Sequence, residues 1–151
     1  MSVIAFEGEL SIPRTFSFDE IRALPAQVTE RSVLLGGRAI CGVRVGAIVG
    51  QLGVKSWARF AVVRSDDGYA ANIPLELVAD CVLVYAVGDV PLPASLGGPY
   101  RFLARGLDRC SNVKRVVTIG FHEAAAEVEH NCPRAIARRA GNLLVLPGGR
   151  S

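Results

Sequence analysis

The sequence predicts a single α+β domain in which β-strands and short helices mix. Segments of strand and helix character follow one another along the 151 residues without the regular βαβ alternation of a doubly wound fold. A chain of this length buries roughly two thirds of the surface that its unfolded form exposes, so one core is sufficient. An almost fully apolar run over residues 81–87 predicts a strand that is covered on both faces.

The N-terminal segment combines a strand signal with a strong helix signal. Residues 3–10 are rich in β-branched and aromatic side chains, which predicts a strand. Ser17 and Glu20 have the spacing of a capping box, in which each residue satisfies a backbone N–H of the other. We therefore expect a short helix over residues 18–24 that ends before Pro25.

The following elements are bounded by glycine and proline. Residues 27–35 predict a strand that ends at the Gly36-Gly37 pair, and residues 45–52 predict a helix that stops at Gly53. Asp67-Gly68 predicts a two-residue hairpin turn whose central residues both have positive φ. The remaining elements expected up to residue 121 are strands over residues 58–65, 100–105 and 114–121, and a short helix that Pro74 opens.

The C-terminal segment differs in kind from the rest. Residues 122–130 have helical character, and a second helix should begin at Pro133 and end before Gly141. We therefore divide the chain into a domain over residues 1–121 and a helical extension over residues 122–151 that packs on the same domain. This extension is the part most suited to contact a protein partner or a second copy of the chain.

The charge is distributed unevenly. Residues 1–95 carry 8 Lys and Arg against 10 Asp and Glu, whereas residues 96–151 carry 9 against 4. The basic residues are scattered and lack the interleaved aromatics that stack on single-stranded nucleic acid. A small anionic ligand therefore fits better than a nucleic acid, and a solvated basic face is the alternative.

The chain has the features of a cytoplasmic protein. No run of 18 apolar residues is present, and Glu7 and Glu9 interrupt the position where a signal peptide would be apolar. The spacing of the cysteines at positions 41, 81, 110 and 132 fits no zinc motif, so reduced, buried thiols are expected. We accordingly predict no membrane contact.

Few residues suggest chemistry on their own. Phosphate-loop, dinucleotide and nucleophile-elbow motifs are missing from the sequence, and His122 and His130 are too far apart on a helix to share a metal. The neighbouring carboxylates Asp66 and Asp67 favour a turn. Tyr69 suits either stacking on a flat heterocycle or packing in the core. No catalytic residue can be assigned from type and spacing.

The order of several motifs resembles the molybdopterin-binding domain of sulfite-oxidase-like oxidoreductases. The resemblance covers about residues 3–121 and implies that family's mixed β-sheet fold. It rests on five segments: "FEGELSIPRTFSFDEIRALP", "CGVRVGAIVGQLG", "SDDGYAANIPLELV", "AVGDVPLPASLGGPYRFLAR" and "NVKRVVTIGF".

The resemblance also implies a cofactor site. The arginine after the "GGP" turn and the lysine of the "VK" pair help to hold the cofactor's phosphate in that family, and Arg101 and Lys114 are the matching positions. A guanidinium and an ammonium group suit a phosphate, and Gly97 and Gly98 would allow close backbone approach. Tyr69 completes the predicted contacts to a pterin or molybdopterin.

The metal ligand of the family has no counterpart. Its molybdenum-binding cysteine would fall near "SVLLGG", where this chain has no cysteine, and the family's histidine before the turn is replaced near Leu96. A thiolate is what fixes such a metal to the protein. Cys41 is the nearest thiol, and it could serve as the molybdenum ligand only if the alignment of this chain with the family were shifted.

These observations predict binding of a pterin-type small molecule without catalysis. The first alternative is a molybdenum-dependent oxidoreductase, which would require Cys41 or another ligand. The second is an interaction scaffold that uses residues 122–151, because a fold does not by itself determine a function.

Overall fold

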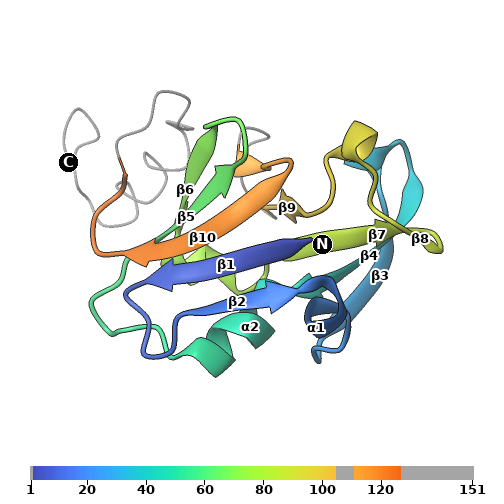
Figure 1. Ribbon diagram of the computed structural model, residues 1–151. Helices are drawn as coiled ribbons and strands as arrows, with labels where there is room; N and C mark the ends of the chain where they lie inside the picture. The colour runs from blue at the N-terminus through green and yellow to red at the C-terminus, as the bar shows by residue number, and fades with distance from the viewer. Residues whose placement is uncertain (1, 105–110, 127–151) are drawn as a thin grey trace.

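Two β-sheets enclose the main core of the protein in a computed structural model, which describes residues 2–104 and 111–126 (Figure 1). The first sheet has the strand order β2-β1-β10-β5-β6. Its strands are β1 (Val3–Gly8), β2 (Arg14–Ser17), β5 (Phe60–Ser65), β6 (Ala70–Pro74) and β10 (Val116–His122). Strands β1 and β10 pair in parallel and the other neighbours are antiparallel, which makes this sheet mixed.

The second sheet is antiparallel and has the order β3-β4-β7-β8, with β9 also paired to β7. It comprises β3 (Gln27–Ser32), β4 (Arg38–Arg44), β7 (Val82–Val87), β8 (Val90–Pro91) and β9 (Arg101–Leu103). Leu83 packs in the main core between the sheets, whereas Val82 and Val84 pack in a smaller cluster on the other face. This arrangement confirms that the apolar run over residues 81–87 is a strand covered on both sides.

Short helices fill the ends of the two sheets. The segments are α1 (Phe18–Arg22), α2 (Val45–Leu52), α3 (Leu75–Val78) and the 3₁₀ turns η1 (Val33–Leu35) and η2 (Ala94–Leu96). Helices α1 and α2 lie below β2 in the view of Figure 1 and bury Ile21 and Ile48. The predicted capping box is confirmed, because Ser17 Oγ accepts from the Glu20 N–H and Glu20 Oε1 accepts from the Ser17 N–H. Helix α2 stops at Gly53, whose φ is 67°, as expected.

The β5–β6 hairpin differs in detail from the prediction. Gly68 has a φ of 94°, but among the described non-glycine residues only Ala26 and Arg115 have positive φ, so Asp67 does not. Ser65 donates its N–H to the Tyr69 carbonyl, and the loop between them contains three residues instead of two. A three-residue hairpin loop needs positive φ only at its glycine, which explains the difference.

Two further predictions need correction. Strand β4 is formed by residues for which no element was expected, and it lies between β3 and β7.

The helix expected over residues 122–130 is wrong in its first residues, because His122 ends β10 and residues 123–126 are not helical. The Asn72 side chain, which is fully buried, pairs there with both backbone polar groups of Ala126. The remaining residues of the predicted extension lie outside the described residues.

A membrane-spanning helix is not found in the described part of the chain, because none of its helices has the required length and apolar character.

Candidate functional site

The turn between η2 and β9 leaves no room for side chains at its two glycines. Gly97 has a φ of 94° and ends η2. A Cβ on Gly97 would lie 3.0 Å from Lys114 Cγ and 3.1 Å from Arg101 Cδ. A Cβ on Gly98 would overlap the carbonyl group of Leu92. The turn therefore packs directly against Arg101 and Lys114, the two residues expected at a phosphate.

Strand pairing explains why these two cations are neighbours. Phe102 and Val113 exchange backbone hydrogen bonds as an antiparallel bridge, which brings their sequence neighbours Arg101 and Lys114 close together. The carbon chains of both cations lie beside the Gly97 turn. The structure thus brings together Arg101, Lys114, Gly97 and Gly98 as predicted.

Arg101 is buried and has no counter-ion among the described residues. Its side chain is 8 % exposed, its Nη1 donates to the Leu96 carbonyl at 3.2 Å, and its buried Nε has no hydrogen-bond partner. Burial lowers the pKa of this guanidinium from its usual value. Within residues 2–104 and 111–126, neither Arg101 nor Lys114 has a carboxylate partner. A buried guanidinium with an unsatisfied donor, beside a second cation, is the arrangement that an anionic ligand would stabilise.

Tyr69 lies at the rim of a neighbouring cavity. The cavity has a volume of about 210 Å³ and is lined by Ser65, Asp67, Tyr69, Asn112, Lys114 and Arg115. Tyr69 is partly buried against the main core, and burial raises the pKa of its hydroxyl. The core role expected for Tyr69 is therefore confirmed in part, and its ring also lines the cavity beside Lys114. Stacking of this ring on a heterocycle stays a prediction.

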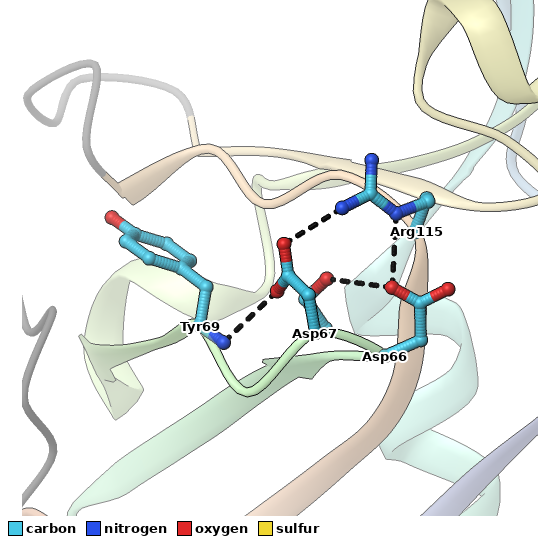
Figure 2. A network of polar contacts seen from close by, with 5 residues as sticks. Asp66, Asp67, Tyr69 and Arg115 are labelled. Carbon is cyan, nitrogen blue, oxygen red and sulfur yellow. Dashed lines mark hydrogen bonds and ion pairs between the residues drawn. The ribbon is translucent and has the colours of Figure 1, made fainter.

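An ion-pair network that the sequence did not indicate borders the same cavity. Arg115 Nε donates to Asp66 Oδ1 at 2.9 Å, and Arg115 Nη2 donates to Asp67 Oδ2 at 2.7 Å (Figure 2). Asp67 Oδ1 also accepts from the Tyr69 N–H, which is the main cause of the lowered pKa of this carboxyl. The turn role expected for both aspartates is correct, but their pairing with Arg115 was missed, since no local pattern links positions so far apart.

Cys41 is not part of this site. It lies on β4 in a different cavity, of about 280 Å³, together with Phe18 and Tyr85. Its Sγ contacts the Gly88 carbonyl and Thr29 Oγ1, both at 4.0 Å.

The strand geometry separates Cys41 from Arg101. Phe102 belongs to the main core, so Arg101 points to the opposite face of the second sheet, whereas Cys41 packs against the main core. In the described residues, no group of His, Cys, Asp and Glu side chains could hold a metal ion.

The fold and the site define a class of protein: an α+β domain of two sheets with two cationic side chains, Arg101 and Lys114, gathered at the Gly97 turn. Residues 34–129 match the family described as "Oxidoreductase molybdopterin binding domain". Because this match covers more than half of the chain, the protein belongs to that family, as the sequence resemblance implied.

One curated protein is similar to this chain in sequence, and one solved structure is similar to it in fold. The chain is 28 % identical over 102 residues to "Uncharacterized oxidoreductase YuiH" of Bacillus subtilis (strain 168), which covers 62 % of this chain and 52 % of the relative. It is structurally similar to the sulfane dehydrogenase SoxCD of Paracoccus pantotrophus, with a TM-score of 0.70, 20 % identity, and coverage of 83 % of this chain and 39 % of that one. The structural similarity shows the fold alone. The chain spans only about half of the first relative and less of the second.

Proposed function

We propose that this chain binds a molybdopterin-type molecule through its phosphate, at Arg101 and Lys114. The observation that carries the proposal is the buried Arg101 Nε, which has no partner among the described residues and lies beside Lys114. Membership of the molybdopterin-binding family supports a pterin as the remainder of the ligand.

Electrostatics favours a ligand with at least one negative charge. Within the described residues, the buried Arg101 Nε has no acceptor, and burying such a donor costs free energy. A phosphate beside Arg101 and Lys114 would accept hydrogen bonds from both and remove that cost. Gly97 assists because a side chain there would press against the carbon chains of both cations.

The adjoining cavity is where we place the heterocycle. Tyr69 offers a ring face, and Asn112, Ser65 and Asp67 offer polar groups at the cavity wall. When bound, a molybdopterin cofactor supplies a redox-active centre, while the protein contributes binding, orientation and electrostatics. The residues of this chain fit the phosphate end of such a molecule, whereas Cys41 does not lie with them.

A phosphate-dependent binding experiment tests this proposal. We would titrate the protein with a pterin that carries a phosphate monoester and with its dephosphorylated alcohol, following pterin fluorescence. The phosphate form should bind in the micromolar range. Lys114→Gln should weaken its binding about tenfold or more, because hydrogen bonds to charged groups contribute about 1.5–3 kcal/mol.

The exposed ion pair of Arg14 with Glu20 provides the control. Arg14→Gln removes one positive charge from another part of the first sheet and should leave the affinity unchanged. Equal affinity for both pterins, or equal loss in both variants, would exclude Arg101 and Lys114 as the phosphate site.

A molybdenum-dependent oxidoreductase is the second candidate, and the family match is the observation that favours it. Elemental analysis of protein from a host that makes the cofactor distinguishes the two candidates. About one molybdenum per chain would support the enzyme, and its loss in Cys41→Ser would identify the ligand. A pterin without metal would support a binding protein. An interaction role for residues 122–151 remains a prediction, because residues 127–151 lie outside the described part of the chain.

A further inference from the structure

Arg115 joins the two turns that border the site. Its N–H donates to the Gly97 carbonyl at 2.8 Å, and its own carbonyl accepts from the Asp66 N–H at 3.1 Å. These bonds connect the η2–β9 turn to the β5–β6 hairpin turn. The residue has a φ of 52°, a conformation that non-glycine residues adopt at some cost and only when the surroundings hold them.

The side chain of Arg115 completes the connection. Its guanidinium bridges the carboxylates of Asp66 and Asp67 (Figure 2). Two neighbouring carboxylates neutralise its charge, so it is a poorer anion ligand than Lys114. The hydrogen bond to Asp66 and the charge of that carboxylate raise the pKa of the Arg115 guanidinium above its usual value.

The backbone of Lys114 is fixed by hydrogen bonds of its two neighbours in sequence, Val113 and Arg115. Val113 is bridged to Phe102 on one side, and Arg115 is fixed to Gly97 on the other. The Cβ and Cγ of Lys114 pack against Gly97. The direction of the Lys114 side chain is therefore set by the position of Arg115.

We propose that Arg115, clamped by Asp66 and Asp67, is a positioning residue that directs Lys114 toward the anionic group of the ligand. The inference rests on the proposed function, because it assumes that Lys114 binds an anion. Arg115 acts through Lys114 and through the hairpin that carries Tyr69, so it shapes two walls of the cavity.

If the two aspartates acted only through their charge, one variant would change the phosphate affinity in the direction opposite to that expected from a positioning role. Asp66→Asn/Asp67→Asn removes two negative charges close to Lys114. If these carboxylates acted only through their charge, phosphate binding would become tighter. If they act by holding Arg115, binding becomes weaker although the site becomes more positive.

The experiment measures the affinity for a pterin phosphate monoester in the wild type, Arg115→Gln and Asp66→Asn/Asp67→Asn, with Arg14→Gln as the matched control. We expect both site variants to bind about three- to tenfold more weakly. The three side chains are substantially exposed, at 35 %, 51 % and 52 %, so their ion pairs contribute little to stability and the variants should fold. Tighter binding in the double variant, or no change in either variant, would overturn the inference.

Hydrogen exchange tests the clamp without any ligand. The Arg115 amide, whose own sequence neighbours are unchanged, should exchange about three- to fivefold faster in Asp66→Asn/Asp67→Asn than in the wild type, because its bond to the Gly97 carbonyl depends on the clamp. Unchanged exchange would overturn the inference, whatever the ligand result. Faster exchange in a protein that binds no pterin phosphate would instead contradict the proposed function and leave the clamp standing.

Discussion

Lys114 and Arg101 lie side by side, with the carbon chains of both beside the Gly97 turn. Within the described residues, neither cation has a carboxylate partner. Burial of the Arg101 guanidinium with an unpartnered Nε costs stability in the free protein. An anionic ligand that accepts from this Nε would remove that cost, which is the physical argument for an anion-binding role.

Replacing arginine by lysine at position 101 should weaken phosphate binding more than replacing lysine by arginine at position 114. Arg101→Lys loses the planar fork and leaves a shorter, strongly hydrated ammonium in a buried position, so we expect about tenfold weaker binding of the pterin phosphate. Lys114→Arg keeps the charge at a less buried position and should change the affinity less than threefold. Fluorescence titration of both variants checks this difference. Equal effects at the two positions would mean that charge alone matters.

The ionisation of Tyr100 should be displaced to high pH. Its side chain is fully buried, its hydroxyl donates to the Ser2 carbonyl at 3.1 Å, and burial raises its pKa to about 12. A raised pKa means that the neutral form is favoured in the folded state. Its contribution to stability is therefore complete below about pH 10, the unfolded value, and is lost as the pH rises toward 12.

Tyr100→Phe tests this contribution. The variant should be less stable at neutral pH by about 1–2 kcal/mol, because the Ser2 carbonyl loses its buried donor. Its free energy of unfolding should decline less than that of the wild type between about pH 10 and 12. Chemical denaturation over this range gives the comparison, and parallel curves for the two proteins would contradict the assignment.

Local signals predicted most of the fold correctly. The capping box of Ser17 and Glu20 and the stop at Gly53 depend on neighbours in sequence, and both are present. Helix α1 ends at Arg22 instead of residue 24, and β3 ends at Ser32 instead of residue 35, because tertiary contacts decide where such elements stop. The Asp67-Gly68 turn differs because its loop has three residues. Strand β4 was missed because its partners, β3 and β7, are recognisable only once the sheet is assembled.

The candidate site was predictable only through resemblance to a family. No pattern in the sequence places Arg101 beside Lys114, and the bridge of Phe102 with Val113 supplies that link. The ion pair of Arg115 with Asp66 joins residues 49 positions apart, so charge patterning could not reveal it. Likewise, Cys41 looked like the nearest thiol in sequence, but the alternation of side chains along the sheet puts it on another face.

Asn72 should determine how firmly the segment after β10 is attached. Its amide donates to the Ala126 carbonyl at 3.0 Å and accepts from the Ala126 N–H at 2.8 Å. Asn72→Ala leaves both groups without these bonds, which should lower the free energy of unfolding by about 2–3 kcal/mol.

Amide exchange at Ala126 should rise in the same variant, which would show that the folded unit extends beyond residue 121. A variant with unchanged stability and unchanged exchange at Ala126 would place the boundary where the sequence predicted it.

Gly97→Ala should impair both stability and ligand binding. The positive φ of 94° costs about 1–2 kcal/mol for an L-residue, and the new Cβ would also press against Lys114 and Arg101. Gly37→Ala separates these effects, because Gly37 has a φ of 77° but no atom within 4 Å of its Cβ position. We expect similar backbone strain in both variants, but at least about fivefold weaker pterin phosphate binding only in Gly97→Ala. If Gly37→Ala weakened binding equally, general destabilisation and not displacement of the two cations would explain the loss.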